Sequence, residues 1–185
     1  RIHPARLARG LAEAVERLGV TICEDTEVLS IEPGRAVTTR GTVRADHVIR
    51  ATEGFTAGLA AEHRTWLPMN SSMVVTAPLP ADFWDEVGWE DAATLGDFAH
   101  VYMYAQRTAD DRIAFGGRGV PYRYGSRVDS DGRTQERTVR SLTRLLREFF
   151  PAAAAVPIEH AWSGVLGVPR DWAATVGLDP KTGLG

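Results

Sequence analysis

The first 62 residues contain one helical pattern followed by several short extended ones. In "PARLARGLAEAVERLG" apolar side chains recur at helical spacing, at Leu7, Leu11, Val15 and Leu18. Pro4 suits the first turn of a helix, and Gly19 suits the position just past its end. This pattern predicts a helix that begins near Pro4 and ends before Gly19.

Short strands are expected next. "VTICED" and "TEVLSIEP" each have the composition of a strand, and the second ends at the turn signal Pro33-Gly34. "AVTTRGTVRADHVIRAT" predicts two or three more strands, of which "DHVIRAT" is nearly continuous in apolar residues, as a buried parallel strand would be. "EGFTAGLAAEH" predicts a short helix.

The middle of the chain predicts an antiparallel sheet crossed by one long helix. "NSSMVVTAPLP", "HVYMYAQRT" and "RIAFGGRG" are typical of strands, and "TADDR" is typical of a hairpin turn between the last two. "RTQERTVRSLTRLLREFF" is amphipathic and is followed by Pro151, which ends a helix. "IEHAWSGVLG" and "ATVGLD" predict further strands.

Composition narrows the class of protein. The 185 residues are 44% hydrophobic and 24% charged, which is ordinary for a globular protein, and the net charge of -3 argues against nucleic-acid binding. No apolar run approaches the roughly 20 residues that span a bilayer, so we expect no membrane partner. The single cysteine, Cys23, favours a reducing, cytoplasmic location, and we expect it in the core.

Two glycine-containing segments are candidates for a site. In "VIRATEG", a predicted parallel strand ends in small residues and Gly54, and ligands of α/β sheets bind at such ends. In "RIAFGGRGVPYRYGSR", Gly116 and Gly117 follow a strand where a ligand or the next strand must come close. A plain turn or a β-bulge explains the same glycines without a ligand. Asp110-Asp111 is expected to be a turn, and the histidines have no metal-ligand spacing.

Four segments in order carry a resemblance to the D-amino-acid-oxidase-like family of FAD-dependent oxidoreductases, which includes glycine, sarcosine and amine oxidases. They are "HPARLARGLAEAVERLGVTICEDTEVLSIE", "TTRGTVRADHVIRATEG", "YMYAQRTADDRIAFGG" and "WSGVLGVPRDWAATVGLDPKTGL". The family's amino-terminal GxGxxG segment and its carboxy-terminal glycine-rich segment are absent. Together with a start at Arg1 rather than Met, this suggests a piece of a longer polypeptide that lacks other parts of its own chain.

The resemblance implies a mixed α+β and α/β fold. Part of a Rossmann-like FAD-binding domain is expected at residues 1–62, and a substrate-binding domain with an antiparallel or mixed sheet and helices on one face at 63–161. Residues 162–185 would return to the FAD-binding domain. The family's chemistry is oxidation of a C–N bond by hydride transfer to flavin, so FAD is the expected cofactor, and a small amine or amino acid is the expected substrate.

The resemblance also assigns site residues. The FAD-binding residues would be Val28, Ala51, Thr52, Gly54, Trp162 and Gly164, and the substrate residues Tyr102, Tyr104, Gly116, Gly117, Arg118 and Leu166. Glu53 departs from the small residue usual in the family, and an acid beside a pyrophosphate would repel it unless it points away or binds a hydroxyl. No catalytic acid, base or metal ligand is assigned.

Leu166 bears on the substrate. It stands two residues after Gly164, where the amino-acid oxidase branch of the family has an arginine that pairs with the substrate carboxylate. We therefore expect an amine rather than a free α-amino acid, unless Arg118 or Arg170 replaces that arginine. Two alternatives remain: a non-catalytic binding module that keeps the substrate-domain fold without cofactor, and another flavin or nicotinamide enzyme with a similar substrate domain.

Overall fold

The computed structural model describes residues 2–90, 93–117 and 122–185, which form two compact units. The first unit combines Arg1–Ala51 with Thr175–Gly185, and the second is Thr52–Ala174. The chain thus changes unit at 51/52 and 174/175, whereas the sequence suggested domain limits at 62/63 and 161/162. Which unit contributes to cofactor binding stays a prediction. No helix among the described residues is both long and apolar enough to cross a lipid bilayer.

The helix of the first unit has the bounds that its sequence pattern predicts. Helix α1 (Pro4–Arg17) begins with a proline in its first turn, and the His3 side chain accepts a hydrogen bond from the Arg6 backbone N–H. The chain leaves the helix through Gly19, whose φ of +92° favours glycine. None of its residues is buried, and the predicted apolar positions Leu7 and Leu11 are exposed.

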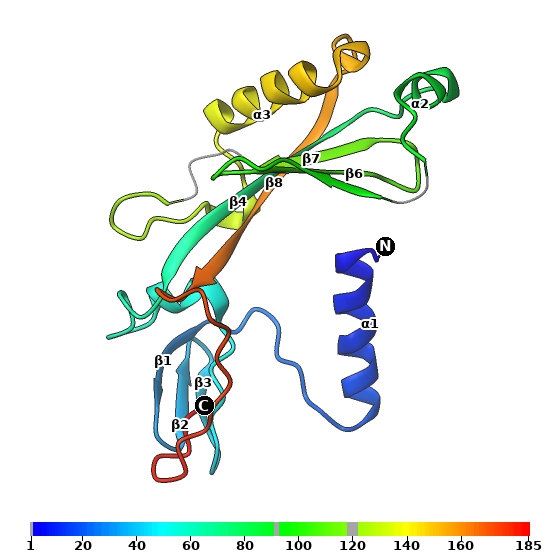
Figure 1. Cartoon of the computed structure of the whole chain (residues 1–185). Helices are drawn as coiled ribbons and strands as arrows, with labels where there is room; N and C mark the ends of the chain where they lie inside the picture. The colour runs from blue at the N-terminus through cyan, green and yellow to red at the C-terminus, as the bar shows by residue number, and fades with distance from the viewer. Residues whose placement is uncertain (1, 91–92, 118–121) are drawn as a thin grey trace. The chain divides into compact units, whose positions relative to one another are not determined.

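A three-stranded antiparallel meander follows in the first unit. Its strands are β1 (Val28–Glu32), β2 (Arg35–Thr38) and β3 (Gly41–Arg44), in the order β1-β2-β3 (Figure 1). The β1–β2 turn passes through Gly34 with φ of +73°, as the Pro-Gly signal predicts. Short strands joined by tight turns confirm the expected meander.

Three predicted strands are absent from this unit. Residues 20–25 form no strand, and Cys23 is exposed rather than in a core. "DHVIRAT" makes only an isolated parallel bridge between Val48 and Leu184, and "ATVGLD" contains no strand. The physical reason is that an apolar run becomes a strand only where a neighbouring backbone satisfies its N–H and C=O groups along its length. Among the described residues, "DHVIRAT" and "ATVGLD" have only a few backbone hydrogen bonds with residues 183–185.

The second unit is built on a five-stranded antiparallel sheet. Its strands are β4 (Leu67–Thr76), β5 (Thr94–Gly96), β6 (Met103–Arg107), β7 (Ile113–Gly117) and β8 (Ile158–Val168), in the order β5-β6-β7-β4-β8. Burial alternates along β4, as expected for a strand with one face in a core. Strands β6 and β7 form the predicted hairpin around "TADDR".

One face of this sheet carries the core. Helix α3 (Glu136–Phe149) lies across it (Figure 1), and Leu142 and Leu146 contribute fully buried side chains. The short helix α2 (Ala81–Val87) adds Phe83 and Trp84 to the same cluster. The sheet contributes the other large side chains: Val74, Met103, Ile113 and Phe115. The predicted amphipathic helix and its end before Pro151 are confirmed, and so is a mixed α/β fold with helices on one face of an antiparallel sheet.

Three 3₁₀ turns complete the second unit. They are η1 (Glu53–Gly58), η2 (Ser130–Gly132) and η3 (Pro151–Ala153). The first replaces the short helix predicted for "EGFTAGLAAEH" and contacts strands β4 and β8. Consequently η1, like α3, is fixed to the sheet rather than being a free connection.

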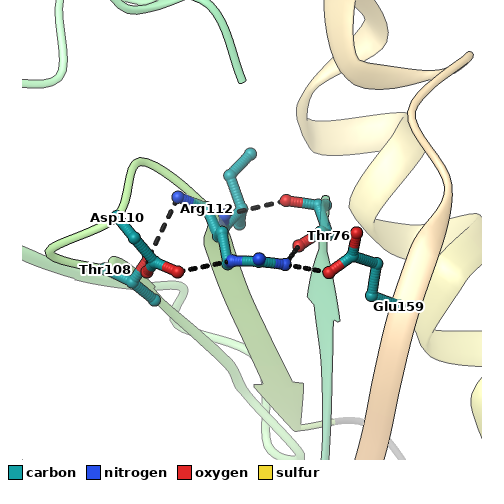
Figure 2. Close-up of polar contacts among 6 residues, drawn as sticks. Thr76, Thr108, Asp110, Arg112 and Glu159 are labelled. Carbon is teal, nitrogen blue, oxygen red and sulfur yellow. Dashed lines mark hydrogen bonds and ion pairs between the residues drawn. The ribbon is translucent and has the colours of Figure 1, made fainter. Parts of the chain in front are cut away.

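Arg112 joins three strands at the hairpin end of the sheet. Figure 2 shows its guanidinium between Asp110, Glu159 and the Thr76 backbone carbonyl. The Nε–Oδ2 distance to Asp110 is 2.6 Å, and the Nη1–O distance to Thr76 is 3.1 Å. Because Thr76 belongs to β4 and Glu159 to β8, one side chain connects the β6–β7 hairpin to both strands.

An Arg112→Ala variant is expected to lower the melting temperature by about a few degrees, because partly exposed ion pairs contribute little to folding stability. Arg144→Ala, which removes one exposed pair at 3.8 Å, is the matched control and should change nothing. Differential scanning fluorimetry measures both. An equal loss in the two variants would contradict a bridging role for Arg112.

The same cluster predicts a pH dependence. The pKa of Asp110 lies below its usual 3.8 because the Thr108 hydroxyl, and then the Arg112 guanidinium, donate hydrogen bonds to its carboxylate. Ionised Asp110 therefore stabilises the folded state above pH 3.8, and this contribution is lost as the pH falls below that value. The difference in melting temperature between wild type and Asp110→Asn should accordingly shrink below pH 3.8.

Candidate functional site

Three of the six expected substrate residues, Tyr104, Gly116 and Leu166, lie on the sheet face opposite α3. Strand register places Tyr104, Gly116, Met73 and Trp162 side by side in one row across β6, β7, β4 and β8. The next residues of the same face on β4 and β8 are Ser71 beside Gly164, and then Met69 beside Leu166. We call this set of residues the open face.

The open face differs from the core face in burial and resembles it in being apolar. Val74 and Phe115 on the core face are fully buried, whereas Met73 and Trp162 on the open face are half-buried and Leu166 is 50% exposed. None of the open-face residues carries a charge. Sulfur, aromatic and aliphatic side chains therefore surround two hydroxyl groups, those of Ser71 and Tyr104.

Tyr104 lies over Gly116 on the neighbouring strand. A Cβ atom built at Gly116 would come within 2.7 Å of Tyr104 Cζ and 2.9 Å of Met73 Cγ. The missing side chain lets the Tyr104 ring cross β7, and its hydroxyl lies 2.5 Å from Ser71 Oγ on β4. Tyr102 contacts the same ring edge-on, with 6.2 Å between ring centroids.

Gly117 is also in close contact with a neighbouring strand. Its φ is +109°, and an added Cβ would lie 2.7 Å from the Met103 Cα atom. The approach of the β6 backbone explains this glycine without a ligand. Arg118, expected to follow it as a substrate residue, lies outside the described residues.

Gly164 is the exception among the predicted glycines. An added Cβ there would meet no atom within 4 Å, and the residue is exposed. No contact among the described residues therefore requires a glycine at this position. Leu166, two residues further along β8, projects on the same face of the sheet. The expected position of a carboxylate-binding arginine thus belongs to the open face.

The expected FAD-binding residues divide between the two units. Val28 begins β1 and is half-buried, and Ala51 is the exposed last residue of the first unit's main segment. Thr52 belongs to the second unit, and its hydroxyl lies 2.7 Å from that of Thr56. Trp162 stacks on His160 with 5.8 Å between ring centroids. Each keeps its predicted role as a proposal.

Gly54 and its neighbour Glu53 contact strand β8. A Cβ at Gly54 would approach Val165 Cβ to 3.0 Å, so this glycine allows close contact between η1 and the strand. Glu53 has φ of +47°, and its carboxylate accepts a hydrogen bond from the Gly167 N–H. The carboxylate of Glu53, the residue that departs from the family pattern, therefore makes a hydrogen bond within the protein.

Sequence reasoning missed Ser71 and Met73. Both lie in "NSSMVV", where alternation marks two faces but not which one is open. Among the residues that the structure describes, no group of three or more His, Cys, Asp or Glu side chains is arranged to hold a metal ion.

A two-unit chain with an antiparallel sheet covered by helices on one face matches several solved flavoenzyme structures. Glycine oxidase from Geobacillus kaustophilus superposes with a TM-score of 0.71 at 25% identity, over 96% of this chain and 46% of that one. L-proline dehydrogenase from P. horikoshii gives 0.72 at 19% identity over 98% of this chain and 48% of that one, a likeness of fold alone.

The chain belongs to the DAO family of FAD dependent oxidoreductases, whose family model matches residues 1–184. Among curated relatives, the probable oxidoreductase OrdL of Rhizobium meliloti is 32% identical over 90% of this chain. Gamma-glutamylputrescine oxidoreductase of Escherichia coli is 29% identical over 88% of it. The chain spans 37% of the length of each of these two relatives. FAD is the cofactor of the family.

Proposed function

We propose that the protein of which this chain forms part oxidises the C–N bond of an amine, with the substrate bound against the open face. One observation carries the choice of substrate: Leu166 stands on this face at the position where the resemblance implies an arginine. A leucine cannot pair with a carboxylate, and a carboxylate without a charged partner in a dry site costs several kcal/mol.

The residues of the open face fit a flat cofactor and a small substrate. Gly164 leaves unfilled space above β8 beside Ser71, and Trp162 and Met73 provide an apolar wall. FAD, when bound, supplies the two-electron oxidation. The chain's own contribution is to orient the amine and to exclude water with its apolar side chains.

One name among the similar proteins supports an amine substrate. The Escherichia coli relative is named for gamma-glutamylputrescine. A 24% identical relative from Rhodobacter capsulatus is named a sarcosine oxidase subunit, and sarcosine carries an α-carboxylate as glycine does. The glycine oxidase neighbour acts on a free amino acid. A comparison of amines with free amino acids as substrates therefore distinguishes these two possibilities.

The test is a substrate panel on the full-length protein, with flavin reduction followed by absorbance. Amines without a free α-carboxylate should reduce the flavin faster than glycine. Leu166→Arg should lower the KM for glycine or sarcosine by roughly 10- to 100-fold, the usual strength of a hydrogen bond to a charged group. Val43→Arg, at an exposed strand position of the first unit, is the control for added charge.

Two outcomes would contradict this proposal. If glycine reduces the wild-type flavin as fast as any amine, the substrate class is wrong, and loss of that activity in Arg118→Ala would locate the carboxylate site there. If no amine or amino acid reduces a stoichiometrically bound flavin, the chain serves another reaction or a binding role.

A Gly164→Ala variant tests whether the space above β8 is used. The melting temperature should stay unchanged, because the added methyl group meets no atom of the residues that the structure describes and no positive φ is required. kcat/KM should nevertheless fall by about tenfold or more, since small displacements in a site are costly. Gly58→Ala, also free of contacts within 4 Å, is the control. Unchanged kinetics would show that nothing occupies this space.

A further inference from the structure

The Ser71 and Tyr104 hydroxyls form a polar pair in the middle of an apolar surface. They come from β4 and β6, which are separated by β7, and their oxygens are 2.5 Å apart. The pair exists because Gly116 leaves room for the Tyr104 ring to cross β7. Three strands therefore cooperate to bring two hydroxyls together on the open face.

The pair keeps hydrogen-bonding capacity after its own contact is made. Each hydroxyl has one donor and two acceptor lone pairs, and one hydrogen bond between them leaves one O–H donor and several lone pairs. Both side chains are half-buried, and Gly164, with no atom within 4 Å of an added Cβ, lies directly beside Ser71. Space and an available donor thus occur at the same place.

The chemistry of the pair selects for a neutral group. Met69, Met73, Trp162 and Leu166 surround it, and none of them offers a charge to balance an ionised ligand. A hydroxyl donor suits an amide carbonyl or an alcohol oxygen, and the remaining lone pairs suit an amide N–H.

We propose that Ser71 and Tyr104 together bind a neutral amide or hydroxyl group of the substrate at a distance from the C–N bond that is oxidised. This inference rests on the proposed function and adds a specificity determinant to it. Ser71 fixes the Tyr104 hydroxyl and shares in binding, while Gly116 positions the Tyr104 ring. A substrate without an amide or hydroxyl group gains no binding affinity from Ser71 and Tyr104.

The experiment compares two amines on the full-length flavin-loaded protein. N-acetylputrescine carries one neutral amide, and putrescine is the same diamine without it. The variants are Ser71→Ala, Tyr104→Phe, the double variant and Ser71→Thr, which keeps a hydroxyl. Ser72→Ala, on the buried face of the same strand, and Tyr124→Phe, in an exposed loop, are the matched controls.

Ser71→Ala and Tyr104→Phe should each raise the KM for N-acetylputrescine by about tenfold and leave kcat within roughly twofold, as expected for lost hydrogen bonds made equally in ground and transition states. Putrescine kinetics should not change. The double variant should be little worse than either single one, because the pair acts as a unit. Ser71→Thr should restore much of the loss, and both controls should behave as wild type.

Calorimetric titration separates this inference from the proposed function. If N-acetylputrescine binds the wild type and binds Ser71→Ala about tenfold more weakly, the pair is a binding site even where turnover fails. Equal effects on both amines, no effect on either, or no binding by the wild type would overturn the inference. If amines reduce the flavin but substitution of Ser71 and Tyr104 changes neither binding nor kinetics, the inference is overturned and the proposed function stands.

Discussion

A Gly117→Ala variant is expected to lose roughly 2 to 5 kcal/mol of folding free energy, the sum of a strained backbone and an overpacked contact. Gly117 has φ of +109°, which L-residues rarely adopt, and its added Cβ would lie 2.7 Å from the Met103 Cα atom. Backbone atoms of a central strand cannot move aside as the end of a side chain can. Strands β6 and β7 would have to separate, and the core residues Met103 and Phe115 would lose contacts.

Urea denaturation of the full-length protein, followed by tryptophan fluorescence, measures the loss. Trp84 and Trp89 are buried in the core of the second unit and report its unfolding. Gly116→Ala is the informative comparison, because its nearest obstacle is the movable Tyr104 ring, and it should cost less stability while displacing the hydroxyl from Ser71. A Gly117→Ala variant as stable as wild type would contradict the close strand contact.

The isolated 185-residue chain is expected to purify without FAD, whereas a longer polypeptide that joins it to a GxGxxG strand, turn and helix should carry the cofactor stoichiometrically. The pyrophosphate of a dinucleotide is bound by a glycine-rich turn and a helix N-terminus, and the sequence contains no GxGxxG segment. The FAD content of the two preparations should differ almost completely, because without the GxGxxG segment the phosphates lose their main hydrogen-bond donors.

Visible absorbance of the two preparations at equal protein concentration provides the measurement. Circular dichroism is the control, because absence of flavin absorbance is informative only if the isolated chain is folded. A yellow preparation of the isolated chain would show that residues such as Thr52 and Trp162 bind the flavin without that segment.

Local signals in the sequence determined the elements that depend on near neighbours. Helix α1 follows from its apolar spacing between Pro4 and Gly19, and α3 from an amphipathic run ended by Pro151. The β6–β7 hairpin follows from two strand patterns around "TADDR". These structures close within a few residues, so their signals are complete in the sequence. The order of four segments was likewise sufficient for the FAD-dependent family, which the family match confirms.

Only the tertiary structure decided which residues meet across the sheet. The apolar runs at 20–25 and in "DHVIRAT" have strand composition but form no strand, because a strand requires a partner along its length, and "DHVIRAT" meets one only at its bridge to Leu184. The sequence predicted that a ligand or the next strand comes close to Gly116, and in the structure the Tyr104 ring from the next strand lies over it. Composition cannot distinguish these two kinds of neighbour.

Ser71 and Ser72 give the clearest case. They are identical and adjacent in the sequence, yet Ser72 is buried on the core face, while Ser71 lies on the open face with its hydroxyl against Tyr104. Alternation along β4 requires only that they point to opposite sides. The sequence thus determined that one of two serines faces away from the core, and the packing of α3 against Val74 decided which one, because burying that apolar face fixes the orientation of the whole strand.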